Sequence, residues 1–154
     1  MRTYFDHEKL DVYQLELQFI GWITGLIIAI KKRPSEVRLS EVIDQFDRAS
    51  LSALLNTAEG NGRRQRQARA KFFDDARGSV TECAACLDAL VVKTVSTPEK
   101  IDPGKQLLVR SASILTKLIA RFDSFSSSIR EEPCDERSEI ENEEEDENEE
   151  KTRT

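Results

Sequence analysis

The stretch FDDARGSVTECAACLDALVVKT, residues 73–94, decides the fold class. Apolar residues recur along it at spacings of three and four, which is the period of one face of an α-helix. The residues of this stripe are Phe73, Ala76, Val80, Cys83, Leu87, Leu90 and Thr94. No proline interrupts the stripe, so the sequence predicts one long helix from about Arg63 to Val95.

The sequence before this stripe predicts a second helix, from Ser35 or Ser40 to Glu59. One face of it is apolar at helical spacing, and acidic residues occupy the other side. The residues of the apolar face are Val42, Ile43, Phe46, Ala49, Ala53 and Leu54. Gly60-Asn61-Gly62 follows and supplies a stop signal, because glycine favours the backbone conformation that ends many helices.

A loop and a fourth helix are predicted after the stripe. Prolines break the pattern in residues 96–104, and Asp102-Pro103 is typical of an N-cap followed by a first-turn proline. Beyond this loop a further stripe consists of Leu108, Ser111, Leu115, Leu118, Phe122 and Phe125. Four amphipathic helices with short connections favour an all-α, up-and-down four-helix bundle within residues 1–130.

The first helix, predicted from Asp6 to Arg33, is apolar on more than one side. Its stripe at helical spacing is Leu10, Tyr13, Leu17, Ile20, Thr24 and Ile27, and beyond Phe19 apolar side chains surround most of the helix. One bundle core covers only one face of a helix, so the remaining apolar surface needs a second cover. We therefore predict a homo-oligomer whose interface contains Phe19, Trp22, Ile23, Leu26, Ile27 and Ile30.

The same apolar run bears on the location of the protein. Residues 19–30 are fewer than the roughly 20 that a membrane-spanning helix needs. Glu16 and Gln18 precede the run, and the chain start lacks the pattern of a secretory signal. Three cysteines, an odd number, are typical of a reducing compartment. We predict a cytoplasmic protein with no membrane contact, and a membrane anchor is the minor alternative.

Charge is divided unequally along the chain, which has a net charge of −6. Residues 131–154 contain 13 acidic and 3 basic residues, whereas residues 1–130 contain 16 acidic and 20 basic ones. The acidic segment has one isoleucine and no aromatic residue, so it cannot bury enough apolar area to offset its ordering entropy. We predict a disordered tail over residues 131–154, which either solubilises the protein or competes with nucleic acid for a basic surface.

The usual catalytic and metal-binding patterns are missing from the sequence. Cys83 and Cys86 form a C-x-x-C in the middle of the long helix, where core packing is expected rather than redox chemistry or zinc binding. His7 is the only histidine, and no nucleophile pattern surrounds it, so it is interpreted as a surface residue. We predict no enzymatic activity, no cofactor and no metal site.

The strongest functional signal is the basic segment RRQRQARAK, residues 63–71. It carries five positive charges and no acid, at Arg63, Arg64, Arg66, Arg69 and Lys71. Positive charge at a helix start opposes the helix dipole, which indicates that another group compensates it. Nucleic-acid phosphate is one candidate, and Glu59, acids of a neighbouring subunit or the acidic tail are the others.

Three motifs indicate a family. They are FDHEKLDVYQ at residues 5–14, NTAEGNGR at residues 56–63 and ARGSVTE at residues 76–82. These resemble patterns of the four-helix-bundle proteins encoded in intervening sequences of bacterial 23S ribosomal RNA genes, over residues 5–125. The positions that carry the most specific match are Asn56, Glu59, Gly60, Gly62 and Arg63.

That resemblance implies a bundle that assembles into a ring-like homopentamer and has no enzymatic activity. It also implies a structural role for the five motif residues, at the end of the second helix and the start of the third. The accessory variability protein of diversity-generating retroelements is a relative of the family. This relationship implies that the protein contacts nucleic acid and a reverse transcriptase. This chain departs from the family pattern in Leu54-Leu55 and in its acidic tail.

The expected function is that of a non-enzymatic, homo-oligomeric accessory factor. It would bind RNA, DNA or a ribonucleoprotein through Arg63, Arg64, Arg66, Arg69 and Lys71. The alternative is a protein-interaction scaffold with no nucleic-acid role. The two differ in their response to salt, because phosphate contacts weaken steeply with salt and an apolar interface does not.

Overall fold

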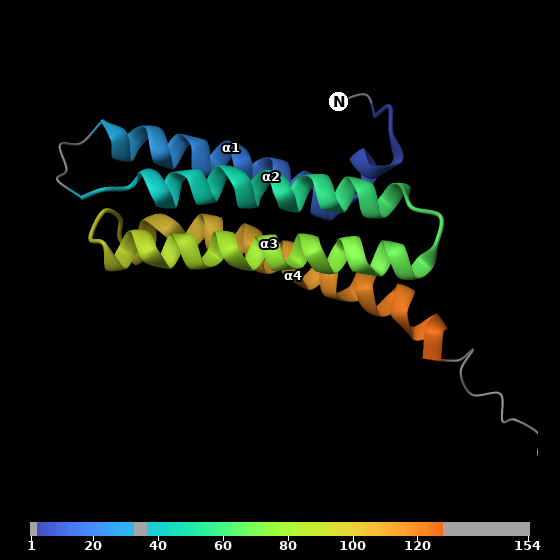
Figure 1. The fold of residues 1–154 in the computed structure, drawn as a ribbon. Coiled ribbons are helices and arrows are strands. Elements are labelled where there is room, and N and C mark those ends of the chain that lie inside the picture. The colour runs from blue at the N-terminus through green and yellow to red at the C-terminus, as the bar shows by residue number, and fades with distance from the viewer. Residues whose placement is uncertain (1–2, 33–36, 128–154) are drawn as a thin grey trace, which may run out of the picture.

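The described part of the chain is a bundle of four antiparallel helices. The computed structural model describes residues 3–32 and 37–127, with side chains up to Asp123. A 3-10 helix, η1 (Asp6–Lys9), precedes α1 (Asp11–Lys31), α2 (Ser40–Gly62), α3 (Arg66–Val92) and α4 (Pro98–Ser127). Each α-helix packs on the one before it and α1 also packs on α4, so the described helices form the predicted up-and-down arrangement (Figure 1). The predicted tail, residues 131–154, lies outside the described residues.

Helix α3 confirms the stripe that decided the fold class. Its apolar positions are at most 2% exposed and belong to one continuous core, namely Phe73, Ala76, Val80, Cys83, Leu87 and Leu90. Only the end of the stripe differs from the prediction. The helix stops at Val92, and Thr94 lies beyond it in the turn, with a φ of 58°.

Helix α1 faces the core with a different set of residues from the predicted stripe. The buried residues are Val12, Leu15, Glu16, Phe19, Ile23, Ile27 and Ile30. By contrast, Leu17 is 41% exposed and Thr24 is also exposed. The predicted stripe is wrong for this helix because apolar residues on several of its sides leave the period ambiguous.

The residues of the predicted subunit interface lie in or against the core of their own bundle. Phe19, Ile23, Ile27 and Ile30 are buried in the core of their own bundle, and Trp22 and Leu26 are half-buried against it. Trp22 lies so close to Gly104 of α4 that an added methyl group there would overlap its ring. The surface that α1 leaves exposed is its outer face, defined by Leu17, Gly21, Thr24, Gly25 and Ile28.

Helix α4 begins earlier than predicted. Pro98 is its first residue, a position where the missing N–H costs nothing because the first turn of a helix has no acceptors for it. The backbone carbonyl of Thr97 accepts hydrogen bonds from the N–H groups of Lys100 and Ile101 at 3.1 and 3.2 Å. Pro103, expected to start the helix, therefore lies inside it. The predicted loop of residues 96–104 is correspondingly shorter.

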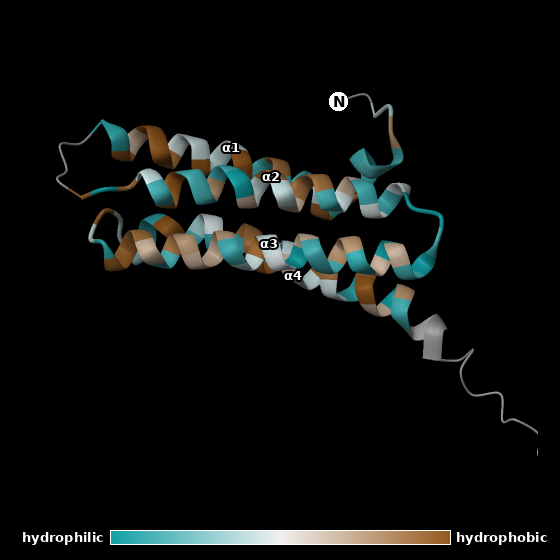
Figure 2. Ribbon diagram, in the orientation of Figure 1, coloured by the Kyte–Doolittle hydropathy of each residue, from teal (hydrophilic) through white to brown (hydrophobic). Residues whose placement is uncertain are grey.

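Helix α1 is the one described helix that is long and apolar enough to cross a membrane. The core helix of a soluble protein can have the same length and composition. In the bundle, α1 packs on both α2 and α4. Figure 2 shows that its hydrophobic residues continue along its length, whereas the connection between α2 and α3 is hydrophilic.

Candidate nucleic-acid interface

The basic segment lies where α2 turns into α3, at the end of the bundle that also carries η1 and the end of α4 (Figure 1). Helix α2 continues through the predicted stop signal and ends at Gly62, with Arg63 as its C-cap. Gly60 is buried in this last turn. A Cβ at Gly60 would lie 3.0 Å from Cε1 of Phe73, so glycine permits the close approach of α2 and α3.

The side chain of Arg63 contacts one residue of α2 and one residue of α3. Its guanidinium forms an ion pair with Glu59, one helical turn earlier in α2. The same group lies over the ring of Phe72 in α3, with its Cζ atom 4.8 Å from the ring centroid. Such a stacked cation contributes about 0.5–1 kcal/mol at an exposed site. Arg63 therefore helps to fix the connection between α2 and α3.

Arg66 and Arg69 reach across the bundle to α4. Their Cζ atoms lie 5.2 and 4.6 Å from the ring centroid of Phe122, which Phe73 contacts at 5.9 Å. Arg66 also donates a hydrogen bond from Nη2 to the backbone carbonyl of Arg121, at 2.7 Å. The two arginines thus tie the start of α3 to the last turns of α4.

Arg69 has a further contact within the turn. Its Nη2 donates to the side-chain oxygen of Asn61 at 3.2 Å, while its buried Nε has no hydrogen-bond partner among the described residues. The groups that compensate the arginines at the start of α3 are therefore partly internal. They are Glu59, Asn61, the Arg121 carbonyl and the rings of Phe72 and Phe122.

Arg64 and Lys71 differ from these three arginines. Both are exposed, and neither forms a hydrogen bond or ion pair with another described residue. We call the five cations Arg63, Arg64, Arg66, Arg69 and Lys71 the basic corner. Three of its members have structural contacts, and Arg64 and Lys71 have their full charge available to a partner.

The remaining motif residues, Asn56 and Gly62, differ in their contacts. Asn56 donates from Nδ2 to the Ser52 hydroxyl at 3.2 Å, and the Ser79 hydroxyl contacts the same oxygen at 2.9 Å. This chain of hydrogen bonds joins α2 to α3. Gly62 is exposed, and a Cβ there would meet nothing within 4 Å. The resemblance implies a structural role for Glu59, Gly60 and Arg63. The ion pair between Arg63 and Glu59 and the close approach of Phe73 to Gly60 agree with that role.

Sequence reasoning missed a buried carboxyl group in α1. Glu16 is 3% exposed, and its Oε1 accepts a hydrogen bond of 2.8 Å from the Thr57 hydroxyl. Its second oxygen has no partner among the described residues. Burial raises the pKa of Glu16 to about 7, although the bond from Thr57 acts in the opposite direction. The only sequence signal is a carboxylate beside apolar residues, which exposed helix positions show as well.

The two cysteines of α3 pack in or against the core, as predicted. Cys83 is 1% exposed, and burial raises the pKa of its thiol to about 12. Cys86 is half-buried, and burial raises its pKa too. His7 lies in η1 rather than in a longer helix, half-buried between the rings of Phe5 and Tyr13, at centroid distances of 5.7 and 4.8 Å.

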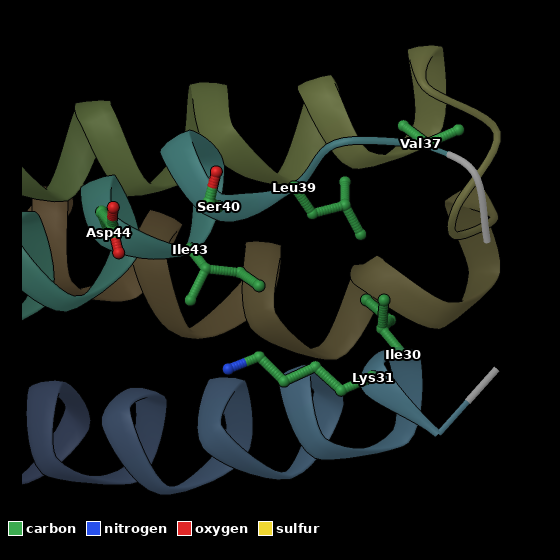
Figure 3. Close-up of a pocket in the computed structure, with 7 residues that line it drawn as sticks. All are labelled: Ile30, Lys31, Val37, Leu39, Ser40, Ile43 and Asp44. Carbon is green, nitrogen blue, oxygen red and sulfur yellow. The ribbon is translucent and has the colours of Figure 1, made fainter. Parts of the chain in front are cut away.

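Other candidate sites carry little chemistry. Among the residues that the structure describes, no group of three acidic, histidine or cysteine residues is placed to hold a metal ion. A hollow of about 370 Å³ lies at the opposite end of the bundle, between the end of α1 and the start of α2 (Figure 3). Ile30, Leu39 and Ile43 give it an aliphatic lining, and Lys31 and Asp44 are its charged residues.

The fold and this corner define a small four-helix-bundle protein with a motif-built turn between its second and third helices. A family model described as 23S rRNA-intervening sequence protein matches residues 8–117. The chain belongs to this family. Neither a curated protein nor a solved structure matches it. The matched region contains the basic corner and ends before Phe122, the ring on which two of its arginines lie.

Proposed function

We propose that this protein is a non-enzymatic accessory factor that binds nucleic-acid phosphates through the basic corner. RNA is the first candidate, because the family to which the chain belongs is described by its connection with 23S rRNA. A ribonucleoprotein, with a reverse transcriptase as the protein partner that the resemblance implies, belongs to the same proposal. The proposed location is the cytoplasm.

The observation that carries the proposal is the exposure of Arg64 and Lys71 within a segment of five cations and no acid. Neither side chain is engaged by another described residue. Phosphate contacts of this kind bind without sequence preference and release counterions, so they give affinity that falls with salt. The contacts of Arg63, Arg66 and Arg69 join α2, α3 and α4 beside these two cations.

Assembly would strengthen this binding. We propose a homo-oligomer, with the ring-like pentamer that the resemblance implies, which repeats the basic corner once per subunit. Several weak phosphate contacts on one particle then act together, since binding of the first raises the effective concentration of the next. The oligomer would thereby bind nucleic acid more tightly than a single, modestly basic subunit does.

The proposal is tested by replacing Arg64 and Lys71 with glutamine. Each lost phosphate contact lowers the slope of log affinity against log salt by about one unit, so the double variant loses about two units and binds an RNA duplex more weakly. The matched control is Lys93→Gln with Lys100→Gln, which removes the same charge at the opposite end of the bundle. Equal salt slopes and affinities for the two double variants would refute the proposal.

Arg66→Ala and Arg69→Ala are poorer tests, although their charges lie in the same segment. Both guanidinium groups lie on Phe122, and Arg66 also holds the Arg121 carbonyl. Their removal would loosen the end of α4 as well as remove charge. A loss of binding in those variants would therefore not separate a phosphate contact from a change in the fold.

The alternative, a protein-interaction scaffold, is favoured by the outer face of α1. Leu17 and Ile28 are 41% and 51% exposed there, and Gly21 and Gly25 leave the space between them open. An apolar contact through this face would persist at salt concentrations that abolish phosphate binding. Retention of the physiological partner at high salt, together with no RNA binding at low salt, would favour the scaffold.

A further inference from the structure

The acidic segment and the basic corner have opposite charge and belong to one chain. Residues 139–150 contain nine acidic residues and no basic one. Residues 63–71 contain five basic residues and no acidic one. Each segment carries charges of one sign only. When the two segments come together, opposite charges therefore pair and no like charges meet.

Helix α4 ends at the end of the bundle that carries the basic corner. Arg66 contacts the Arg121 carbonyl, and Arg66 and Arg69 lie over Phe122, so this part of α4 is in direct contact with the corner. From Phe122 to Ser127, the last residue of α4, the helix advances by only about 8 Å. The last described turn of α4 therefore lies at the end of the bundle that carries the α2–α3 connection, as Figure 1 also shows.

The length of chain between the two is sufficient for contact. Glu139 follows Ser127 by twelve residues. A random coil of twelve residues has a root-mean-square span of about 20 Å, against the roughly 8 Å of helix that separates Phe122 from Ser127. A tether of this kind gives an effective concentration in the millimolar range, enough for weak ion pairs to form a populated contact.

We propose that residues 139–150 dock on the basic corner of the same protein and compete there with nucleic-acid phosphate. Arg64 and Lys71 are the principal contacts, because they are exposed and otherwise unengaged. Exposed ion pairs are individually weak and screened by salt, so the docked segment exchanges readily. The competition with nucleic acid rests on the function proposed above, whereas the docking itself does not.

Docking is tested by carbodiimide coupling in the full-length protein, with the cross-linked peptides identified by mass spectrometry. The reagent joins a lysine amine to a carboxyl group only when the two are in contact, and Lys71 is the one lysine of the corner. We expect coupling of residues 139–150 to Lys71 to exceed coupling to Lys117 several-fold. Lys117 is exposed and closer to the tail in sequence, so random collisions of the tether would favour it.

A variant separates specific docking from proximity. Arg64→Gln leaves Lys71 intact and removes its basic neighbour, so docking predicts a clear fall in the yield at Lys71 and no fall at Lys117. Lys93→Gln, at the opposite end of α3, is the matched control and should change neither yield. Equal yields at Lys71 and Lys117, unaffected by Arg64→Gln, would overturn the docking.

Competition is tested with a full-length variant in which the nine acidic residues of 139–150 are changed to glutamine or asparagine. With a millimolar effective concentration and a weak intrinsic contact, removal of the competitor should tighten binding of an RNA duplex about tenfold at low salt. Equal RNA affinity of the two proteins overturns the competition. Selective coupling to Lys71 without RNA binding by either protein supports the docking and overturns the proposed nucleic-acid function.

Discussion

Replacing Glu16 by glutamine tests whether the core of the bundle holds a protonated carboxyl group. Glu16 is 3% exposed, with one oxygen hydrogen-bonded to Thr57 and the other without a described partner. A neutral carboxyl fits this environment better than a carboxylate, because burial disfavours the charged form. Glutamine has nearly the same shape, keeps an oxygen for the Thr57 hydroxyl and never ionises.

The magnitude follows from the pKa of this group in the two states. Burial raises the pKa of Glu16 from 4.5 to about 7 in the folded protein, so the folded state binds the proton more tightly than the unfolded state. The stabilising effect of that proton is complete below pH 4.5 and is lost as the pH rises to about 7. A shift of this size corresponds to roughly 3 kcal/mol of unfolding free energy.

The assay is urea unfolding of the wild type and Glu16→Gln at equal protein concentration, from about pH 4 to about pH 8.5. We expect similar free energies of unfolding at the acid end. The variant should become the more stable protein as the pH rises, by roughly 3 kcal/mol at the alkaline end. Glu41→Gln, at an exposed position of α2, serves as the control and should show no comparable change.

The pH dependence of the difference decides the outcome. Subtracting the wild type from the variant cancels every other titrating group, so the remaining slope between pH 4.5 and about 7 belongs to Glu16. A difference that stays constant across the whole range would refute the reasoning. It would mean that Glu16 ionises in the folded protein with little cost.

The remaining predictions concern packing, assembly and reactivity. Gly60→Ala should cost about 1–3 kcal/mol of unfolding free energy in urea titrations, because its methyl group would lie 3.0 Å from a ring carbon of α3, whereas Gly62→Ala should change stability by less than about 0.5 kcal/mol. Leu17→Glu with Ile28→Glu should lower the particle mass in light scattering without loss of helical circular dichroism, and an unchanged mass would exclude the outer face of α1 as the subunit contact. Cys83 should resist alkylation at about pH 8 until urea unfolds the chain, since burial raises its pKa to about 12; mass spectrometry that finds rapid modification of the folded protein would contradict this.

The sequence determined the fold class because one helix has an unambiguous period. In α3, the six stripe residues from Phe73 to Leu90 follow helical spacing, and all six are buried in the structure. Only one face of such a helix can enter the core. Six core positions of α3 therefore follow from the order of residues alone, whereas the burial of Ala70 was not predicted.

The sequence did not determine which face of α1 is buried or where α4 begins. Apolar residues surround most of α1, so several faces satisfy the same pattern, and packing on α2 and α4 selects the one with Phe19 and Ile23. For α4, Pro98 and Pro103 both fit the first turn of a helix. The helix begins at the first of them, and nothing local to either proline distinguishes the two.

For the candidate site, the sequence supplied the charges and the family motif, and the tertiary structure assigned their roles. Five cations in residues 63–71 are visible as a run, but the contact of Arg66 and Arg69 with Phe122 joins residues more than fifty positions apart. That contact exists only because α4 returns antiparallel to α3. The amino-acid sequence determines which side chains are present. The packing of the helices determines which of these side chains have contacts within the bundle, and it leaves Arg64 and Lys71 available to a partner.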